Sequence, residues 1–92
     1  REQDKLIRWG GEEFLVLLPD TKLNDAEYIG NKLRLAISEQ LAGEIPNNVS
    51  VEITVTGGVS EFKKDETFEV LFKRADNALY KGKKAGRNCI RS

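Results

Sequence analysis

The chain has 92 residues, which is the size of one small domain. Its 15 Lys and Arg residues balance 15 Asp and Glu residues, and this neutral charge argues against a nucleic-acid-binding protein. The chain has no histidine and one cysteine, Cys89, which excludes Ser-His-Asp or Cys-His catalysis, a His-ligated metal and a disulfide framework. Any catalysis must therefore use carboxylates, Lys or Arg side chains and a hard cation such as Mg²⁺.

The first predicted element is a β-hairpin. Two strand candidates, Lys5 to Trp9 and Phe14 to Leu18, flank the pair Gly10-Gly11. Both glycines can adopt the positive φ angles of a primed two-residue turn without a steric penalty. The second strand candidate is apolar on both faces, which predicts an interior strand that is covered on both sides.

A helix is predicted next, from Asn24 to Ala42, with Asn24 as its N-cap and Gly43 as its terminator. Its apolar residues recur at helical spacing and form one stripe: Ala26, Ile29, Leu33, Ile37 and Leu41. Alternating apolar and polar residues then predict a strand from Val51 to Ser60, with Gly57-Gly58 inside it.

The last predicted elements are a second helix, capped by Thr67 and fading near Gly82 and Gly86, and a short edge strand at Cys89-Ile90. The order of hairpin, helix, strand, helix and short strand predicts an α/β (α+β) domain in which helices flank a mixed β-sheet. We expect residues 1–92 to form a single domain.

Three groups of polar residues have side chains suited to binding or catalysis. Glu12-Glu13 directly follows the glycine turn, where a carboxylate suits a Mg²⁺ ion and the missing Cβ atoms let a nucleotide approach. Taken alone, the pair is more typical of solvated residues at a hairpin tip.

The other two groups are basic or mixed. Lys83 and Arg87 lie four residues apart, on one face if the helix continues, and could clamp a polyphosphate. Alone they are more typical of an ordinary basic helix terminus. Arg1 and Asp4 offer donors and an acceptor for a guanine edge or a phosphate, although charged residues three apart are common.

Several motifs together resemble one family. Arg8-Trp9-Gly10-Gly11-Glu12-Glu13-Phe14 is similar to the signature of the GGDEF family of diguanylate cyclases, in its Glu variant. Four further runs agree with the family pattern in order and spacing: Pro19-Asp20-Thr21, Val55-Thr56-Gly57-Gly58-Val59, Ala75-Asp76-Asn77-Ala78-Leu79-Tyr80 and Lys83-Lys84-Ala85-Gly86-Arg87-Asn88. The resemblance covers essentially the whole chain and outweighs the interpretations drawn from isolated residues.

The resemblance implies a palm-like nucleotide cyclase fold and a reaction that condenses two GTP into cyclic di-GMP and pyrophosphate. It implies that Glu12 binds Mg²⁺ or Mn²⁺, that Glu13 is the second catalytic acid, and that GTP lies over Gly10 and Gly11. Lys83 and Arg87 correspond to the residues that contact the triphosphate. Arg1 and Asp4 correspond to the R-x-x-D site, at which the product cyclic di-GMP inhibits the enzyme.

The resemblance also implies a homodimer, because each domain holds one GTP, and an upstream sensory or regulatory domain in the parent protein. The family domain is roughly twice this length. We therefore expect its first half, with a metal-binding Asp and the guanine-reading residues, to be missing, and the fragment alone to be inactive. Lys32 occupies the position of a second inhibitory arginine, which favours weaker product binding. We expect a cytoplasmic location, with membrane anchoring of the parent left open.

Two alternatives to a cyclase stay open from the sequence. The parent could be a catalytically inactive receptor that binds cyclic di-GMP through Arg1 and Asp4, or GTP through the signature. A purely structural role leaves the agreement at so many polar positions unexplained, so it ranks last. Both acids of the signature are present, which favours the enzyme.

Overall fold

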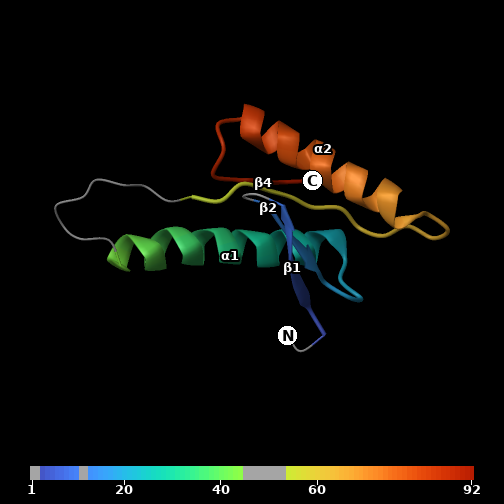
Figure 1. Cartoon of the computed structure of the whole chain (residues 1–92), viewed down its shortest axis with the longest axis horizontal. Coiled ribbons are helices and arrows are strands. Elements are labelled where there is room, and N and C mark those ends of the chain that lie inside the picture. The colour runs from blue at the N-terminus through green and yellow to red at the C-terminus, as the bar shows by residue number, and fades with distance from the viewer. Residues whose placement is uncertain (1–2, 11–12, 45–53) are drawn as a thin grey trace.

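The computed structural model describes residues 3–10, 13–44 and 54–92 and combines helices with short strands (Figure 1). In chain order the elements are β1 (Lys5–Gly10), β2 (Glu13–Leu17), α1 (Leu23–Glu44), β3 (Gly57–Gly58), α2 (Phe68–Lys84) and β4 (Ile90–Arg91). The predicted α+β class is confirmed. In the described residues the strands form two separate two-stranded sheets, β1-β2 and β3-β4.

The predicted hairpin is present, but Gly10 is paired within it and does not lie in its turn. β1 and β2 pair antiparallel from Lys5 with Leu17 to Gly10 with Glu13, with an irregularity between Arg8 and Gly10. Gly10 therefore belongs to β1 and is not a central turn residue. Gly86 is the one glycine with positive φ in the described part of the chain, so the prediction that Gly10 uses this conformation is wrong.

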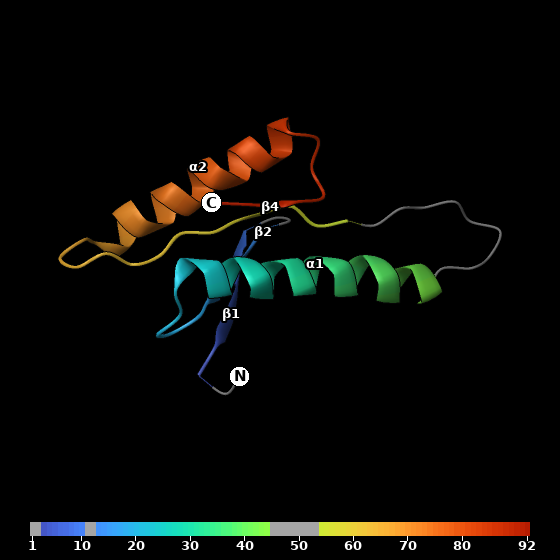
Figure 2. The same ribbon diagram turned by 180° about the vertical axis from the view of Figure 1, so that it is seen from behind.

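The second sheet lies between the two helices. β3 and β4 pair in parallel, and the Gly57 and Val59 N–H groups donate to the carbonyls of Cys89 and Arg91, at 2.9 and 2.8 Å. Helix α1 contacts β4, and α2 contacts both strands; the view from behind shows the same layers (Figure 2). The predicted strand Val51 to Ser60 is shortened because its partner is two residues long, and residues 51–53 lie outside the described ranges.

Close backbone approach holds the helices on this sheet. A Cβ atom on Gly58 would lie 2.0 Å from the Ala75 carbonyl oxygen of α2, so no side chain fits there. On the α1 side, Ile90 fits against Gly30, with 3.4 Å between Ile90 Cγ2 and the Cβ position of that glycine. Among the residues with described burial, Ala78 and Gly82 are the buried positions, so the core is thin.

The helix starts differ from each other in how they are capped. Thr67 caps α2 as predicted, since its Oγ1 accepts a hydrogen bond from the Val70 N–H at 3.3 Å. Helix α1 begins at Leu23, so the prediction of Asn24 as N-cap is wrong. The Leu23 N–H donates instead to Glu61 Oε1 at 2.7 Å, a partner 38 residues away. Gly43 lies inside α1, which ends at Glu44.

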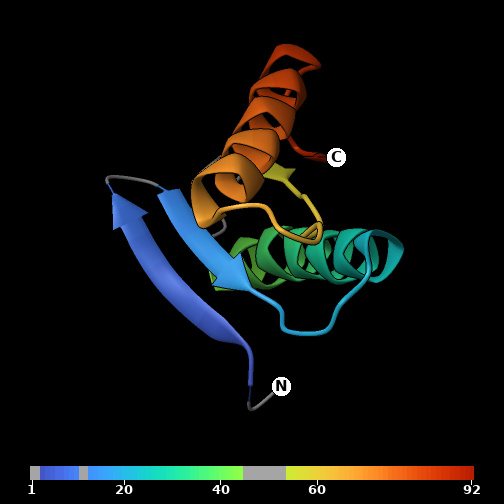
Figure 3. The ribbon, with the colours of Figure 1, turned by 90° about the vertical axis from the view of Figure 1, so that its right-hand side faces the viewer.

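The hairpin extends to one side of the helices, with β2 nearer to them than β1 (Figure 3). Phe14 and Val16 share one face of β2 and are 61% and 41% exposed. The prediction that this strand is covered on both faces is therefore wrong. In the described residues β2 also pairs with β1 alone, so it is not an interior strand.

In the part of the chain that is described, no helix is long and apolar enough to cross a membrane.

Candidate functional site

Two residues of the signature, Gly10 and Glu13, form the last cross-strand pair of the hairpin. Gly11 and Glu12 lie outside the described residues. Glu13 is exposed, and a Cβ atom at Gly10 would meet nothing within 4 Å. Because no packing contact requires a glycine at position 10, the open space beside it is available to a ligand.

A divalent cation would find a suitable donor at this tip but not a complete protein cage. Among the described residues there is no group of three or more His, Cys, Asp or Glu side chains that could hold a metal. Mg²⁺ is commonly held by one or two carboxylates together with substrate phosphates and water. The exposed carboxylate of Glu13 and the sequence neighbour Glu12 fit such a shared site.

Lys83 and Arg87 do not share a helical face, because the helix does not continue through both residues as their spacing would require. Helix α2 ends at Lys84, and Arg87 has a φ of 65°. The chain instead folds back on the helix end: the Arg87 N–H donates to the Gly82 carbonyl at 3.0 Å and the Gly86 N–H to the Lys83 carbonyl at 3.4 Å. This turn keeps both basic residues together, and both are exposed.

An aromatic cluster connects the hairpin to α2. The Trp9 ring centroid lies 4.7 Å from that of Phe72 and 6.2 Å from that of Phe68. Phe72 and Lys83 are eleven residues apart on α2, which corresponds to about 16 Å along the helix. The hairpin and the basic turn thus contact different ends of α2, and only an extended ligand can reach from one to the other.

The predicted inhibitory residues are only partly described. Arg1 lies outside the described residues, and Asp4 is half-buried just before β1, where it already takes part in an interaction. Lys32 is exposed on α1, and its Nζ lies 5.5 Å from the centroid of the Tyr28 ring.

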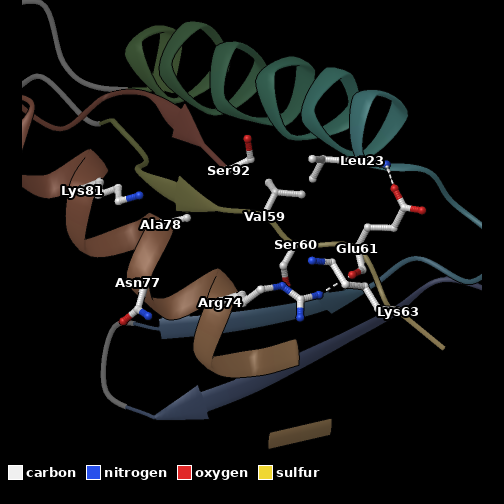
Figure 4. Close-up of a pocket in the computed structure, with 10 residues that line it drawn as sticks. All are labelled: Leu23, Val59, Ser60, Glu61, Lys63, Arg74, Asn77, Ala78, Lys81 and Ser92. Atoms are coloured by element: carbon white, nitrogen blue, oxygen red, sulfur yellow. Dashed lines mark hydrogen bonds between the residues drawn. The ribbon is translucent and has the colours of Figure 1, made fainter. Parts of the chain in front are cut away.

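Sequence reasoning missed a charged network beside an open cavity of about 490 Å³ (Figure 4). The Arg74 guanidinium donates two hydrogen bonds to the Glu66 carboxylate and one to the Glu61 carbonyl. The Lys63 N–H also donates to Glu66 Oε1, at 2.6 Å. The hydrogen bond from Arg74, helped by that from Lys63, lowers the pKa of Glu66 from 4.5 to about 2. Both terminal nitrogens of the Arg74 guanidinium therefore have partners within the protein. Arg74 joins the 61–66 loop to α2 and is not free to bind an anion.

Comparison with known proteins gives a consistent result over nearly the whole chain. The family model described as "Diguanylate cyclase, GGDEF domain" matches residues 1–89. Diguanylate cyclase DgcM of Escherichia coli K12 is 39% identical over 90 residues, covering 98% of this chain and 21% of that protein. Diguanylate cyclase DgcP of Pseudomonas aeruginosa is 41% identical over 91 residues, covering 96% of this chain and 13% of the relative.

A relative with a different printed name aligns equally well. Response regulator PleD of Caulobacter vibrioides is 37% identical over 91 residues, which cover 98% of this chain and 20% of PleD. The chain therefore spans about a fifth or less of the length of these relatives.

Proposed function

The chain belongs to the GGDEF family of diguanylate cyclase domains, and we propose that the protein carrying it makes cyclic di-GMP from two molecules of GTP. The observation that carries this proposal is the family match over residues 1–89, with both acids of the signature present. The diguanylate cyclase names of relatives with 39% and 41% identity support it.

The proposed reaction consists of two equivalent phosphoryl transfers. In each, the 3′-hydroxyl oxygen of one GTP forms a bond to the α-phosphorus of the other, and the bond from that phosphorus to the pyrophosphate oxygen breaks. Each transfer releases one pyrophosphate and one proton, so two GTP give one cyclic di-GMP. Because each domain contributes one bound GTP, the active species is a homodimer.

The hairpin tip supplies the acidic part of the proposed site. GTP lies over Gly10 and Gly11, where the open space beside Gly10 supports close approach to the backbone. Glu12 holds the Mg²⁺ or Mn²⁺ ion, and Glu13 is the second catalytic acid. A bound divalent cation neutralises charge on the phosphates and lowers the pKa of the attacking hydroxyl.

The basic turn supplies the phosphate-binding part. Lys83 offers a point charge and Arg87 a planar guanidinium, which together suit the β- and γ-phosphates. The exposure of both side chains and the turn that keeps them together support this role.

Product inhibition and cellular context complete the proposal. Cyclic di-GMP binds at Arg1 and Asp4 and slows the enzyme, with Lys32 as a weaker third contact than an arginine would be. The protein acts where GTP is abundant, in the cytoplasm, and an upstream sensory or regulatory domain controls it. The length of the relatives supports further domains.

The decisive experiment is product analysis of the complete protein that carries these residues. It is incubated with GTP and Mg²⁺, and cyclic di-GMP and pyrophosphate are followed over time by chromatography. We expect product in a two-to-one ratio of pyrophosphate to cyclic di-GMP, with a rate that falls as product accumulates. If the folded protein forms no product but still binds cyclic di-GMP, the proposed enzyme activity is wrong and the protein is a receptor.

Two variants assign the residues in the same assay. Glu12→Ala should abolish turnover while the circular dichroism spectrum stays unchanged, because a carboxylate at a hairpin tip is not part of the core. Full activity in this variant would contradict the metal-ligand role. Arg1→Ala should remove inhibition by product while the initial rate stays the same, and an unchanged inhibition curve would exclude Arg1 from the inhibitory site.

A further inference from the structure

The turn that carries Arg87 has an unusual backbone. Three consecutive residues have positive φ: Gly86 at 111°, Arg87 at 65° and Asn88 at 47°. Glycine adopts this region freely, but Arg and Asn do so at a cost, and two such residues in succession persist only where surrounding contacts hold them. The contacts that hold this turn therefore determine where the Arg87 side chain begins.

Two of those contacts come from outside helix α2. The Asn88 N–H donates to Thr56 Oγ1 at 2.9 Å, which ties the turn to the segment before β3. The Asn88 side chain reaches the other layer of the fold: Arg34 Nη1 on α1 donates to Asn88 Oδ1 at 3.0 Å, across 54 residues of sequence.

The orientation of Arg34 is itself fixed by its own helix. Arg34 Nε donates to Asn31 Oδ1 at 3.2 Å, and Asn31 Nδ2 donates to the Glu27 carbonyl at 3.1 Å. Arg34 is half-buried, and these hydrogen bonds hold its guanidinium between Asn31 and Asn88. Arg34 uses two different nitrogens of its planar guanidinium for these contacts, and a lysine at this position has only one nitrogen.

We propose that Arg34 is a positioning residue for the triphosphate: through Asn88 it fixes the left-handed turn so that Arg87 and Lys83 are held ready for the β- and γ-phosphates. Arg34 does not itself touch the nucleotide. This inference rests on the proposed function, because it takes from it the binding of GTP phosphates by Lys83 and Arg87. Its benefit is preorganisation, since a turn that is already ordered loses less conformational entropy when the ligand binds.

The test compares the binding of GTP and GMP to the complete protein, because GMP lacks the two phosphates that the turn would hold. Asn88→Gly removes the acceptor for Arg34 but permits the same positive φ, so the fold should survive. We expect Asn88→Gly and Arg34→Ala each to weaken GTP binding and raise the KM for GTP by roughly three- to tenfold. GMP binding and kcat should be unchanged, and the double variant should be no weaker than either single one.

Matched controls separate positioning from general loss of structure. Asn88→Asp keeps an oxygen acceptor for Arg34 and should bind GTP like the unmodified protein. Asn31→Ala removes the other partner of Arg34, leaves Asn88 in place, and should change GTP binding less than Arg34→Ala does. Thermal midpoints of all variants are measured alongside.

Each other outcome identifies what failed. Unchanged GTP binding in Asn88→Gly, or equal losses for GTP and GMP, would overturn the positioning role of Arg34. If Lys83→Ala and Arg87→Ala themselves left GTP binding unchanged, the assignment of the triphosphate site in the proposed function would be wrong.

Discussion

The hairpin and the layered body of this protein are held together in different ways. In the body, α1, β3, β4 and α2 meet by close backbone contact, as where Gly58 lies against Ala75. The hairpin instead leaves large apolar side chains exposed, with Leu6 at 71% and Phe14 at 61%. Its described ring contacts to α2 come from Trp9.

This difference matters because the proposed site is divided between the two regions. Glu13 of the signature is on the hairpin, whereas the proposed phosphate-binding residues, Lys83 and Arg87, lie at the far end of α2 and in the turn that follows it. The body holds the basic turn through hydrogen bonds to Thr56 and Arg34, whereas the hairpin contacts α2 through Trp9, whose side chain is about half-exposed. The position of the hairpin part of the site relative to the basic turn therefore depends on this aromatic contact.

The largest change in stability is expected when alanine replaces a glycine of the body, and the same replacement in the hairpin is the control. In Gly58→Ala the new Cβ would lie 2.0 Å from a backbone oxygen, so β3 and α2 must separate. Overpacking of this kind typically costs about 1–3 kcal/mol, and we expect the upper end or more in the free energy of unfolding.

The matched control, Gly10→Ala, meets no atom within 4 Å and should stay within about 0.5 kcal/mol of the unmodified protein. Urea unfolding followed by circular dichroism measures both. Equal losses of stability in the two variants would contradict the difference in packing between body and hairpin. If Gly10→Ala stays stable but turns over GTP more slowly, the open space beside Gly10 is needed for substrate binding and not for packing.

Two neighbouring lysines on α2 test whether the basic turn has a specific role. Lys83→Ala should weaken GTP binding about tenfold or more, because a charge-assisted hydrogen bond to phosphate is lost. Lys84 instead lies over the Tyr80 ring, with 5.1 Å from Nζ to the centroid, and Lys84→Ala should change binding little. Titration of the complete protein with GTP distinguishes them, and equal losses would indicate only a general effect of positive charge.

The connection between the two regions is tested by Trp9→Ala. Loss of the ring contacts with Phe68 and Phe72 should destabilise the hairpin by about 1–2 kcal/mol. Hydrogen exchange should speed up in β1 and β2 while α2 stays protected. The control Leu6→Ala truncates a side chain that is 71% exposed and should leave exchange unchanged. Faster exchange in α2 as well would mean that the two regions unfold as one unit.

The smallest change in stability is expected when the pH is lowered and Glu66 becomes protonated. The pKa of Glu66 is about 2 in the folded state against 4.5 ordinarily, so its contribution is complete above pH 4.5 and is lost as the pH falls toward 2. Glu66→Gln should therefore be less stable than the unmodified protein at neutral pH, and the difference should shrink between pH 4.5 and 2. Thermal midpoints over this range give the comparison, and a constant difference would exclude Glu66 as the titrating group.

Local sequence was sufficient for the elements whose signals are local. Both helices, the Thr67 cap and the hairpin follow from apolar periodicity and from residues within a few positions of each other, and all are present. The GGDEF signature and its accompanying motifs are equally local, which is why the order and spacing of these residues along the chain are enough to indicate the family.

Only the tertiary structure decided the features that depend on distant partners. The start of α1 is set by Glu61, 38 residues away, and the length of β3 by its short partner β4. The left-handed turn at Arg87 depends on Thr56 and Arg34, so the spacing of Lys83 and Arg87 alone could not decide whether one helix continues through both residues. The periodicity of apolar residues predicts which residues share a face of one helix or strand. Capping, strand pairing and turn geometry are fixed here by hydrogen bonds between different elements, which periodicity does not contain.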